Sequence, residues 1–380
     1  MPFQIEFIKA LVSNKPHPPE PEPTSPLFPI KKVLPDGRTV WVSVPQPDRL
    51  TITVPISADI YAAKVPKSMP PGEFANGLFA YFKSEPFNAH YKTGAAKKMP
   101  QEPGAWKAWY HITLLMGSRQ GQVRFELLWD IKYGIRLRFE CNPRKLGPIG
   151  FEQLANVLAG PQAPFDLPRL VSAARVSRLD LCVDVVGVRM SELLLWYKLE
   201  GKRSLYVGSD GVLETVQIHR KLPPTKPPGV NGPPKKTSNN PTGQVQLKAY
   251  DRVRERLSAQ KWPPFGPAPV LRLERPLYRF GQKSLASLPH LDNKLIDFRA
   301  GFVLSQLPKP VQAWFRYVAA RRTMSEQEAC TLLGVPAQMA ARFRAAELVP
   351  KSDLLSANEV WEYWKVGLAH TGLLKFLQSA

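Results

Sequence analysis

Cysteine is scarce in this chain, and the three cysteines that it has, Cys141, Cys182 and Cys330, are widely separated. Their number and spacing exclude a disulfide framework and a cysteine-based zinc site, so we expect a reducing, cytoplasmic setting. Apolar runs of about 20 residues, the length that a membrane-spanning helix needs, are also missing. The first fifteen residues, MPFQIEFIKALVSNK, lack a basic region followed by a long apolar core, so no secretory signal is expected.

Acidic residues are few relative to basic ones. The chain has 31 Asp and Glu against 52 Lys and Arg, which gives a formal net charge of +21. This excess favours a polyanionic partner, and nucleic acid is the usual one. An anionic membrane surface is the alternative, but the sequence shows no basic amphipathic helix with a strongly apolar face. We therefore expect a nucleic-acid partner and no membrane partner.

Proline, in contrast, is abundant, and many of its 40 residues cluster in three segments: 15–26, 221–243 and 262–269. The first segment reads as a polyproline-type tether that cannot join a core, and the second as a long basic loop. The 380 residues, 44% of them apolar, can build one large domain with appendages or two domains. The predicted division is a Pro-rich N-terminal extension over 1–37, a main domain over 38–305 with a flexible basic insertion at 221–243, and a separate module over 306–380.

Most of the main domain reads as strands, because β-branched and aromatic residues recur there with a period of two. Strands are predicted over 38–44, 48–56, 108–117, 122–129, 134–142, 175–187, 243–257 and 270–285. Helices are predicted over 150–160 and 190–201, where the apolar spacing is helical and a glycine ends each segment. Strands with helices between them, but not in strict alternation, indicate an α+β domain with an antiparallel sheet.

The last part of the chain reads as helices, predicted over 310–322, 325–334, 336–347 and 356–368. Ser325 and Ser356 stand where N-caps belong, and Gly334 stands where a turn belongs. We therefore expect a small all-helical domain after the sheet domain.

The stretch RVSRLDLCVDVVG, residues 175–187, places two aspartates in a run that otherwise reads as a buried strand. Alternate residues of a strand share a face, so Asp180 and Asp184 lie opposite the leucines and valines, on one polar face. Two later strands alternate in the same way. The polar face of the first, 243–257, carries Lys248, Tyr250 and Arg252, and the polar face of the second, 270–285, carries Arg272 and Glu274. Carboxylates on rigid strands suit Mg²⁺ or Mn²⁺, and a nearby tyrosine can attack a phosphodiester. The alternative is a solvated face on which the acids pair with arginines.

Four short motifs occur in an order that resembles the rolling-circle replication initiators, in particular the gene II-type replication protein of filamentous phages and the Rep-trans initiators of small plasmids. The motifs are RLDLCVD (178–184), YVGS (206–209), YDR (250–252) and RLE (272–274). The family patterns run R-[IL]-D-[IL]-x-x-D, Y-x-G-S, Y-[DN]-K and R-[IVL]-E. The likeness covers residues 48–290, and IRLRFECNPRKLG (135–147) is similar to the strand and Asn-Pro element of that group.

The resemblance implies a site-specific DNA endonuclease, a nickase with strand-joining activity. It would cut one strand of a double-stranded origin through a tyrosine, stay linked to the 5′ end, and rejoin the displaced strand after synthesis. The implied residues are a catalytic set, Tyr250, Lys248, Arg252 and Arg272, and a set of ligands for Mg²⁺ or Mn²⁺, Asp180, Asp184 and Glu274. The implied partners are double- and single-stranded origin DNA and the helicase and polymerase of a bacterial host, in whose cytoplasm the protein would act.

Two departures from the family pattern are visible. Arg252 stands where the family has a lysine, and arginine is a poor proton donor because it stays charged. An HxH metal motif is also missing, which leaves His111 and His219, both on predicted strands, as further ligand candidates. Each of them is more often a structural or surface histidine.

Two segments are candidates for DNA contacts outside the chemistry. One is the basic insertion; the other, residues 325–350, looks like a helix-turn-helix of the excisionase or MerR kind, whose second helix could read base edges in a major groove. The candidate contact residues are Lys235, Lys236, Gln338, Arg342 and Arg344. The alternatives are a loop that is merely solvated and a plain helical bundle.

Two other functions stay open at this point. One is a metal-dependent nuclease that uses water and forms no covalent intermediate. The other is a non-enzymatic origin-binding initiator or repressor, whose acids are structural. A Tyr250→Phe variant separates the covalent enzyme from the water-using nuclease.

Overall fold

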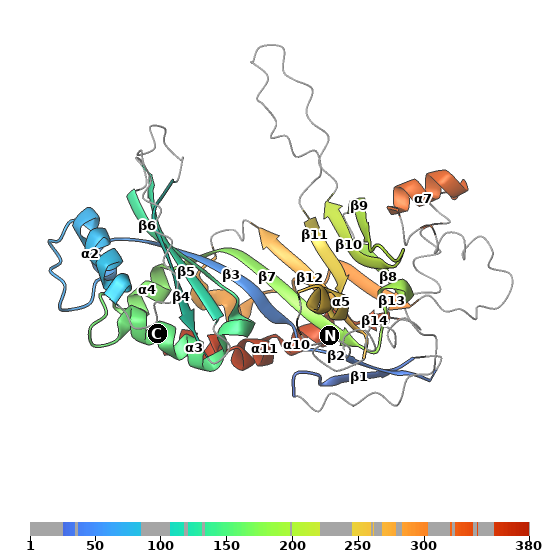
Figure 1. Ribbon diagram of the computed structural model, residues 1–380, viewed down its shortest axis with the longest axis horizontal. Helices are drawn as coiled ribbons and strands as arrows, with labels where there is room; N and C mark the ends of the chain where they lie inside the picture. The colour runs from blue at the N-terminus through green and yellow to red at the C-terminus, as the bar shows by residue number, and fades with distance from the viewer. Residues whose placement is uncertain are drawn as a thin grey trace, which may run out of the picture. The chain divides into compact units, whose positions relative to one another are not determined.

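The computed structural model describes residues 26–34, 37–84, 107–117, 121–130, 134–197, 200–220, 245–259, 261, 268–278, 283–302, 320, 324–336, 340 and 353–379. The chain forms two compact units: the first comprises 1–44, 182–275 and 293–362, and the second 45–181, 276–292 and 363–380. Both units are mixed α/β and their paired strands run antiparallel, as the sequence predicts (Figure 1). None of the described helices is long and apolar enough to cross a membrane.

The second unit has these elements in chain order: β3 (Gln46–Pro55), η1 (Ala58–Ile60), α2 (Pro71–Ser84), β4 (Lys107–Met116), β5 (Gly121–Asp130), β6 (Gly134–Cys141), α3 (Pro143–Ala159), α4 (Leu167–Ala173), the start of β7 (Arg175–Val186), η3 (Leu285–His290), α11 (Trp364–His370) and α12 (Leu373–Gln378). Its strands pair in the order β4–β5–β6–β3, with β7 next. Apolar side chains of one sheet face, such as Phe125, are buried beneath helices, and Phe82 of α2 stacks on Phe125 at 4.5 Å between ring centroids.

The first unit has these elements: β1 (Ile30–Val33), β2 (Thr39–Val42), the end of β7, η2 (Met190–Glu192), β8 (Leu193–Tyr197), β9 (Glu200–Val207), β10 (Leu213–Arg220), β11 (Val245–Asp251), α5 (Arg252–Ser258), most of β12 (Val270–Tyr278), β13 (Phe298–Phe302), α7 (Glu326–Leu333), β14 (Asp353–Leu355) and α10 (Ala357–Glu362). Its strands follow the order β7–β12–β11–β10–β9, and β8, β13 and β14 form a separate small sheet.

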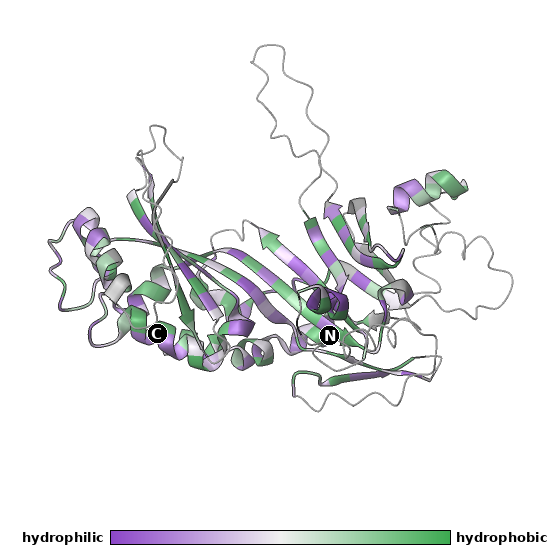
Figure 2. Ribbon diagram, in the orientation of Figure 1, coloured by the Kyte–Doolittle hydropathy of each residue, from purple (hydrophilic) through white to green (hydrophobic). Residues whose placement is uncertain are grey.

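The alternation predicted for β7 is confirmed. Leu179, Leu181, Val183 and Val185 are all buried, at 1% exposure or less. Purple and green bands alternate along the strands in Figure 2, which reflects this division into a polar and an apolar face. The predicted polar face of β7 is nevertheless buried toward the end of the strand, where Cys182 is 2% exposed and Asp184 is 5% exposed.

The helix predicted over 190–201 is wrong. Residues 190–192 form a single 3-10 turn, and Leu193–Tyr197 form β8, which pairs with β13. The run LLLWY is short and apolar, so its periodicity fits a strand as well as a helix, and pairing with β13, far along the chain, decides the outcome.

The helix predicted over 325–334 is confirmed as α7. Ser325 and Glu328 form a capping box, and Gly334 ends the helix in the left-handed conformation at φ 60°. The helix predicted over 356–368 is present as α10 and α11. The helices predicted over 310–322 and 336–347 lie almost wholly outside the described residues.

The predicted boundary at residue 305 does not coincide with the division into units. The segment 293–362 belongs to the first unit, and 363–380 belongs to the second, where Phe376 of α12 packs against Phe151 of α3 at 5.5 Å. A separate all-helical domain therefore stays a prediction.

Candidate functional site

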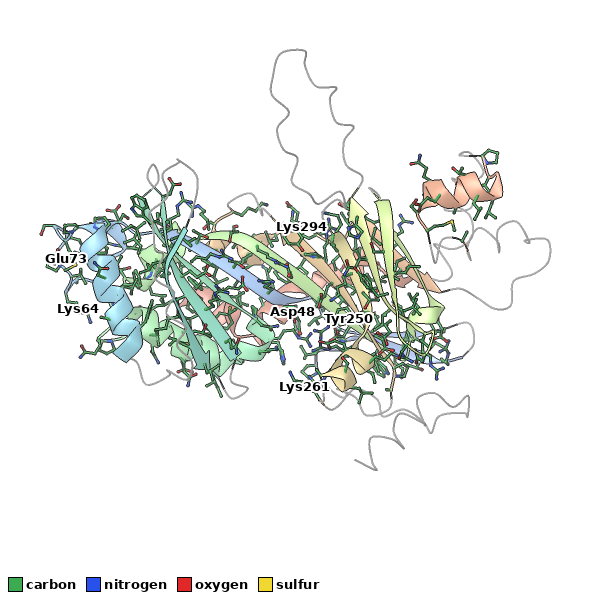
Figure 3. The ribbon with its side chains drawn as sticks, turned by 45° about the horizontal axis from the view of Figure 1, so that its top comes forward. Asp48, Lys64, Glu73, Tyr250, Lys261 and Lys294 are labelled. Carbon is green, nitrogen blue, oxygen red and sulfur yellow. The ribbon has the colours of Figure 1, made fainter. Side chains whose placement is uncertain are left out.

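A polar cluster lies on β11 and β12 of the first unit. The register pairs Lys248 with Glu274 and Tyr250 with Arg272, and side chains of directly opposed residues share a face. The other face of both strands is apolar and buried, with Leu247, Ala249, Leu271 and Leu273 at 2% exposure or less. Figure 3 labels Tyr250 on β11, among the strands of this sheet.

Tyr250 and Glu274 form a short hydrogen bond. The phenol hydroxyl donates to Glu274 Oε1 at 2.5 Å. Lys248 Nζ lies 3.9 Å from Glu274 Oε2 and 4.3 Å from the centroid of the Tyr250 ring. The three groups therefore form one contact cluster of a phenol, a carboxylate and an ammonium, on neighbouring strands.

The Tyr250 phenol is protonated in this environment. Burial raises the pKa of Tyr250 most, and the negative charge and hydrogen bond of Glu274 raise it further, while the charges of Arg272 and Arg252 lower it. The net shift is strongly upward. Tyr250 therefore needs a proton acceptor before it can act as a nucleophile, and Glu274 is in direct contact with its proton.

Asp184 is engaged by an arginine rather than exposed on an open face. Arg272 Nε and Nη2 donate to its two carboxylate oxygens at 2.6 Å and 2.8 Å. Both side chains are buried, with 8% and 3% of their surface exposed, and Ser43 Oγ accepts from the Asp184 backbone N–H at 2.8 Å. The negative charge of the buried Asp184 carboxylate is thus neutralised by a bidentate ion pair with Arg272.

Asp180 belongs to the second unit, whereas Asp184, Tyr250 and Glu274 belong to the first. Arg178 Nε and Nη2 donate to its carboxylate at 2.9 Å and 2.6 Å, and Arg178 stacks over the Tyr278 ring at 4.6 Å. Burial raises the pKa of Asp180, and Arg178 only partly offsets this rise.

The predicted metal ligands do not form a ready donor set. Arginines hold both oxygens of Asp180 and of Asp184, and Glu274 accepts from Tyr250. Among the residues that the structure describes, no three His, Cys, Asp or Glu side chains are grouped so that they could hold a metal ion. The metal site therefore stays a prediction.

Arg252 is not on the strand face that the alternation of β11 predicts for it, and that prediction is wrong. Asp251 caps α5 by accepting from the backbone N–H groups of Val253 and Arg254 at 2.9 Å and 3.0 Å, so the strand ends and a helix begins at Arg252. The Arg252 guanidinium pairs with Glu255. Its charge still acts on Tyr250, whose pKa it lowers.

Arg254, which none of the sequence motifs singles out, ties α5 to the turn after the YVGS motif. Its guanidinium contacts Asp210 at 2.7 Å and Glu214 at 3.2 Å. A Cβ on Gly208 of the motif would lie 2.4 Å from Glu214 Oε1, the end of a side chain that pairs with Arg254. The signal in the sequence is Asp251, a residue type favoured at a helix N-cap, and no spacing in the sequence indicates the contacts of Arg254.

The remaining candidates are placed as follows. His219 is buried on β10, with its ring 3.1 Å from Ser204 Oγ, and His111 lies opposite Glu126 in the β4–β5 pairing. The predicted DNA-contact residues Lys235, Lys236, Gln338, Arg342 and Arg344 lie outside the described residues.

An arginine followed two residues later by an acid recurs along the strands, and one of these stretches differs from the rest. In three, the arginine pairs with the acid of its own stretch: Arg124–Glu126 at 2.6 Å, Arg138–Glu140 at 3.6 Å and Arg178–Asp180 at 2.6 Å. Arg138 also lies 3.3 Å from Glu126, and Glu140 lies 2.6 Å from Arg49. In another, Arg272 pairs with Asp184 instead, and Glu274 contacts Tyr250 and Lys248. The acid beside the tyrosine is therefore used differently from its three counterparts.

No protein-family model matches the chain, and no curated protein matches it either. The case for a function consequently depends on the motifs and on the geometry of the cluster.

Proposed function

We propose that the protein is a DNA nicking and joining enzyme that starts rolling-circle replication, with Tyr250 as its nucleophile. The observation that carries the proposal is the contact of the Tyr250 phenol with Glu274, on adjacent strands whose motifs resemble those of replication initiators. A buried phenol that donates to a carboxylate has its proton acceptor in place. The distinct use of Glu274 among the arginine–acid stretches supports a role beyond ion pairing.

The first step is transfer of a phosphoryl ester to the tyrosine. The Tyr250 oxygen attacks the scissile phosphorus while its proton moves to the Glu274 carboxylate. The bond from phosphorus to the 3′ oxygen breaks, and a phosphotyrosine bond to the 5′ end forms. The leaving 3′ oxygen takes a proton and becomes the hydroxyl that primes synthesis. Lys248, whose side chain is 36% exposed, is the cation of the cluster that can reach substrate and supply that proton.

The second step reverses the first. A new 3′-hydroxyl attacks the phosphotyrosine and gives its proton to Lys248, the phenol leaves and recovers its proton from Glu274, and a strand is closed. The covalent bond conserves the energy of the phosphodiester, so no nucleotide cofactor is needed.

Charge stabilisation comes from arginines that the fold fixes in position. Arg272 is held by Asp184, and its charge favours the phenolate form of Tyr250. Arg252, at the start of α5, acts in the same direction. Such fixed charges stabilise a developing phenolate without reorganisation during the reaction.

Covalent capture tests the proposal and identifies the preferred DNA sequence in the same experiment. The protein is incubated with Mn²⁺ and a pool of single-stranded oligonucleotides with a randomised centre, denatured, and the protein–DNA adducts are purified and sequenced. We expect enrichment of one sequence with wild type and none with Tyr250→Phe. Equal recovery from both proteins would contradict the proposal.

One rival gains support from a specific observation. Asp180 and Asp184 are both paired with arginines, as expected of structural acids in a non-enzymatic origin-binding protein. That protein would bind origin DNA and form no adduct, and substitution of Glu274 would leave its binding unchanged.

A further inference from the structure

A second polar sheet face, in the second unit, carries a set of arginines. It is formed by the side chains of β5, β6, β3 and the start of β7 that point away from the buried apolar face. Its arginines are Arg49, Arg124, Arg136, Arg138 and Arg178, and its acids are Glu126, Glu140 and Asp180. We refer to this set as the arginine face.

The acids of the arginine face lie beneath its arginines. The Glu126, Asp180 and Glu140 side chains are only 9%, 14% and 23% exposed. The Arg124, Arg49 and Arg138 side chains are 54%, 42% and 39% exposed. The surface that meets solvent is therefore guanidinium, although positive and negative groups occur together on this face.

The ion pairs hold the guanidiniums in fixed positions. Glu126 accepts from Arg124 at 2.6 Å and pairs with Arg138 at 3.3 Å, and Glu140 accepts from Arg49 at 2.6 Å. Burial raises the pKa of Glu140, but the hydrogen bonds and charges of Arg49 and Arg138 more than offset this, so the net pKa is lowered and the acid stays ionised. A guanidinium carries five N–H donors, so an arginine paired with one carboxylate can also bind a phosphate.

We infer that the arginine face binds the phosphate backbone of duplex DNA, separately from the nicking cluster. Ordered guanidiniums at the surface of a chain with net charge +21 complement a polyanion. Proteins that bind single strands stack bases on aromatic rings. Among the described residues of β5, β6, β3 and the start of β7, none places an aromatic ring on this face, and the Tyr278 ring of β12 is covered by Arg178. The face therefore suits backbone contacts with a duplex and does not suit base stacking.

The helical side of the same unit offers a matched control. Arg169 on α4 is 59% exposed and pairs with Asp166, and Lys64 donates to the Pro161 carbonyl. Figure 3 labels Lys64 beside α2, on the side of the unit where the helices lie. Removing these two charges changes the net charge as much as removing two arginines of the arginine face does.

The test is binding of a short duplex of arbitrary sequence by full-length protein carrying Tyr250→Phe, measured over a range of salt concentrations. The binding measurement does not involve nicking, because the protein carries Tyr250→Phe. A negative result here therefore leaves the proposed function intact, and failure of the proposed function leaves this test valid. Adding Arg49→Gln and Arg124→Gln should weaken binding and reduce the slope of log Kd against log salt by roughly two units. Adding Lys64→Gln and Arg169→Gln should leave the slope unchanged. Equal slopes in the two double variants would overturn the inference.

A measurement on the protein without arginine substitutions covers the case in which a variant fails to fold. Arginine-selective dicarbonyl modification is mapped by mass spectrometry with and without DNA. Duplex DNA should protect Arg124, Arg138 and Arg49 and leave Arg169 reactive. Protection by a single strand but not by a duplex, or equal protection by an acidic polypeptide, would show that duplex DNA is not the specific ligand of the arginine face.

Discussion

The Tyr250 hydroxyl donates a 2.5 Å hydrogen bond to Glu274, although the two residues are 24 positions apart in the sequence. The pairing of β11 with β12 brings them together, and Lys248 completes the cluster. The proposed mechanism requires the phenol to pass its proton to this carboxylate during attack. A buried phenol hydroxyl needs a hydrogen-bond acceptor in any role, so the experiments below test the proposed proton transfer to Glu274 and not the contact alone.

Replacing Glu274 by glutamine should abolish most of the activity. The amide oxygen can still accept a hydrogen bond from Tyr250, but it is a far weaker base, and proton transfer typically contributes about 10²–10⁴-fold to a rate. The measurement is the rate at which the protein forms a covalent adduct with the oligonucleotide that covalent capture identifies. Glu359→Gln is the matched control, because Glu359 on α10 pairs with Lys32 and not with a residue of the β11–β12 cluster. Equal rates in the two variants would remove Glu274 from the mechanism.

Tyr250 should resist ionisation in alkaline solution. Burial raises its pKa above the ordinary value of 10.0, so it stays a phenol at a pH where exposed tyrosines become phenolates. The tyrosinate absorbance of folded wild type and of Tyr250→Phe should coincide up to about pH 11 and differ by one residue only after unfolding. A difference between the folded proteins near pH 10 would show an accessible, ordinary phenol.

The Asp184–Arg272 pair should be essential to the fold as a pair. Asp184→Asn leaves a buried guanidinium without its counter-charge, for which we expect a loss of about 3–5 kcal/mol in the free energy of unfolding. The double variant Asp184→Asn with Arg272→Gln removes both charges and should be less destabilised than the single one. Denaturant unfolding of wild type, the single variants Asp184→Asn and Arg272→Gln, and the double variant checks this. Losses that simply add would contradict a coupled ion pair.

Stability in acid should depend on Glu140. Burial raises its pKa, but Arg49 and Arg138 lower it further, so the folded value lies below the ordinary 4.5. A depressed carboxyl pKa contributes stability above pH 4.5 that is lost as the pH falls through the folded value. Wild type should therefore lose more stability than Glu140→Gln on acidification from neutral pH to below pH 4.5. Parallel pH profiles would show that Glu140 is not coupled to the arginines.

The sequence carries enough information for the local features of the site. Strict alternation predicted that Leu179 and Leu181 would lie on the face opposite Asp180, and Ser325, a residue type favoured at N-caps, predicted the start of α7. Both features depend on neighbours within one strand or one turn, which is why they can be read directly.

The remaining features depend on which partner a side chain or strand finds, near or far along the chain. Whether Asp184 binds a metal ion or pairs with an arginine depends on Arg272, 88 residues away. Asp180 has the same local pattern and a partner two residues away. Pairing with β13 made a strand of 193–197, and the cap formed by Asp251 took Arg252 off the strand. Periodicity alone does not contain these partners.

The most direct test of the central claim is to map the DNA adduct within the protein. A captured oligonucleotide complex is digested with nuclease and protease, and the peptide that carries a nucleotide phosphate is sequenced by mass spectrometry. The account predicts the modification on Tyr250, in the peptide that contains the YDR motif. A cut substrate with no modified peptide, or a nucleotide on Tyr206 or Tyr278, would contradict it.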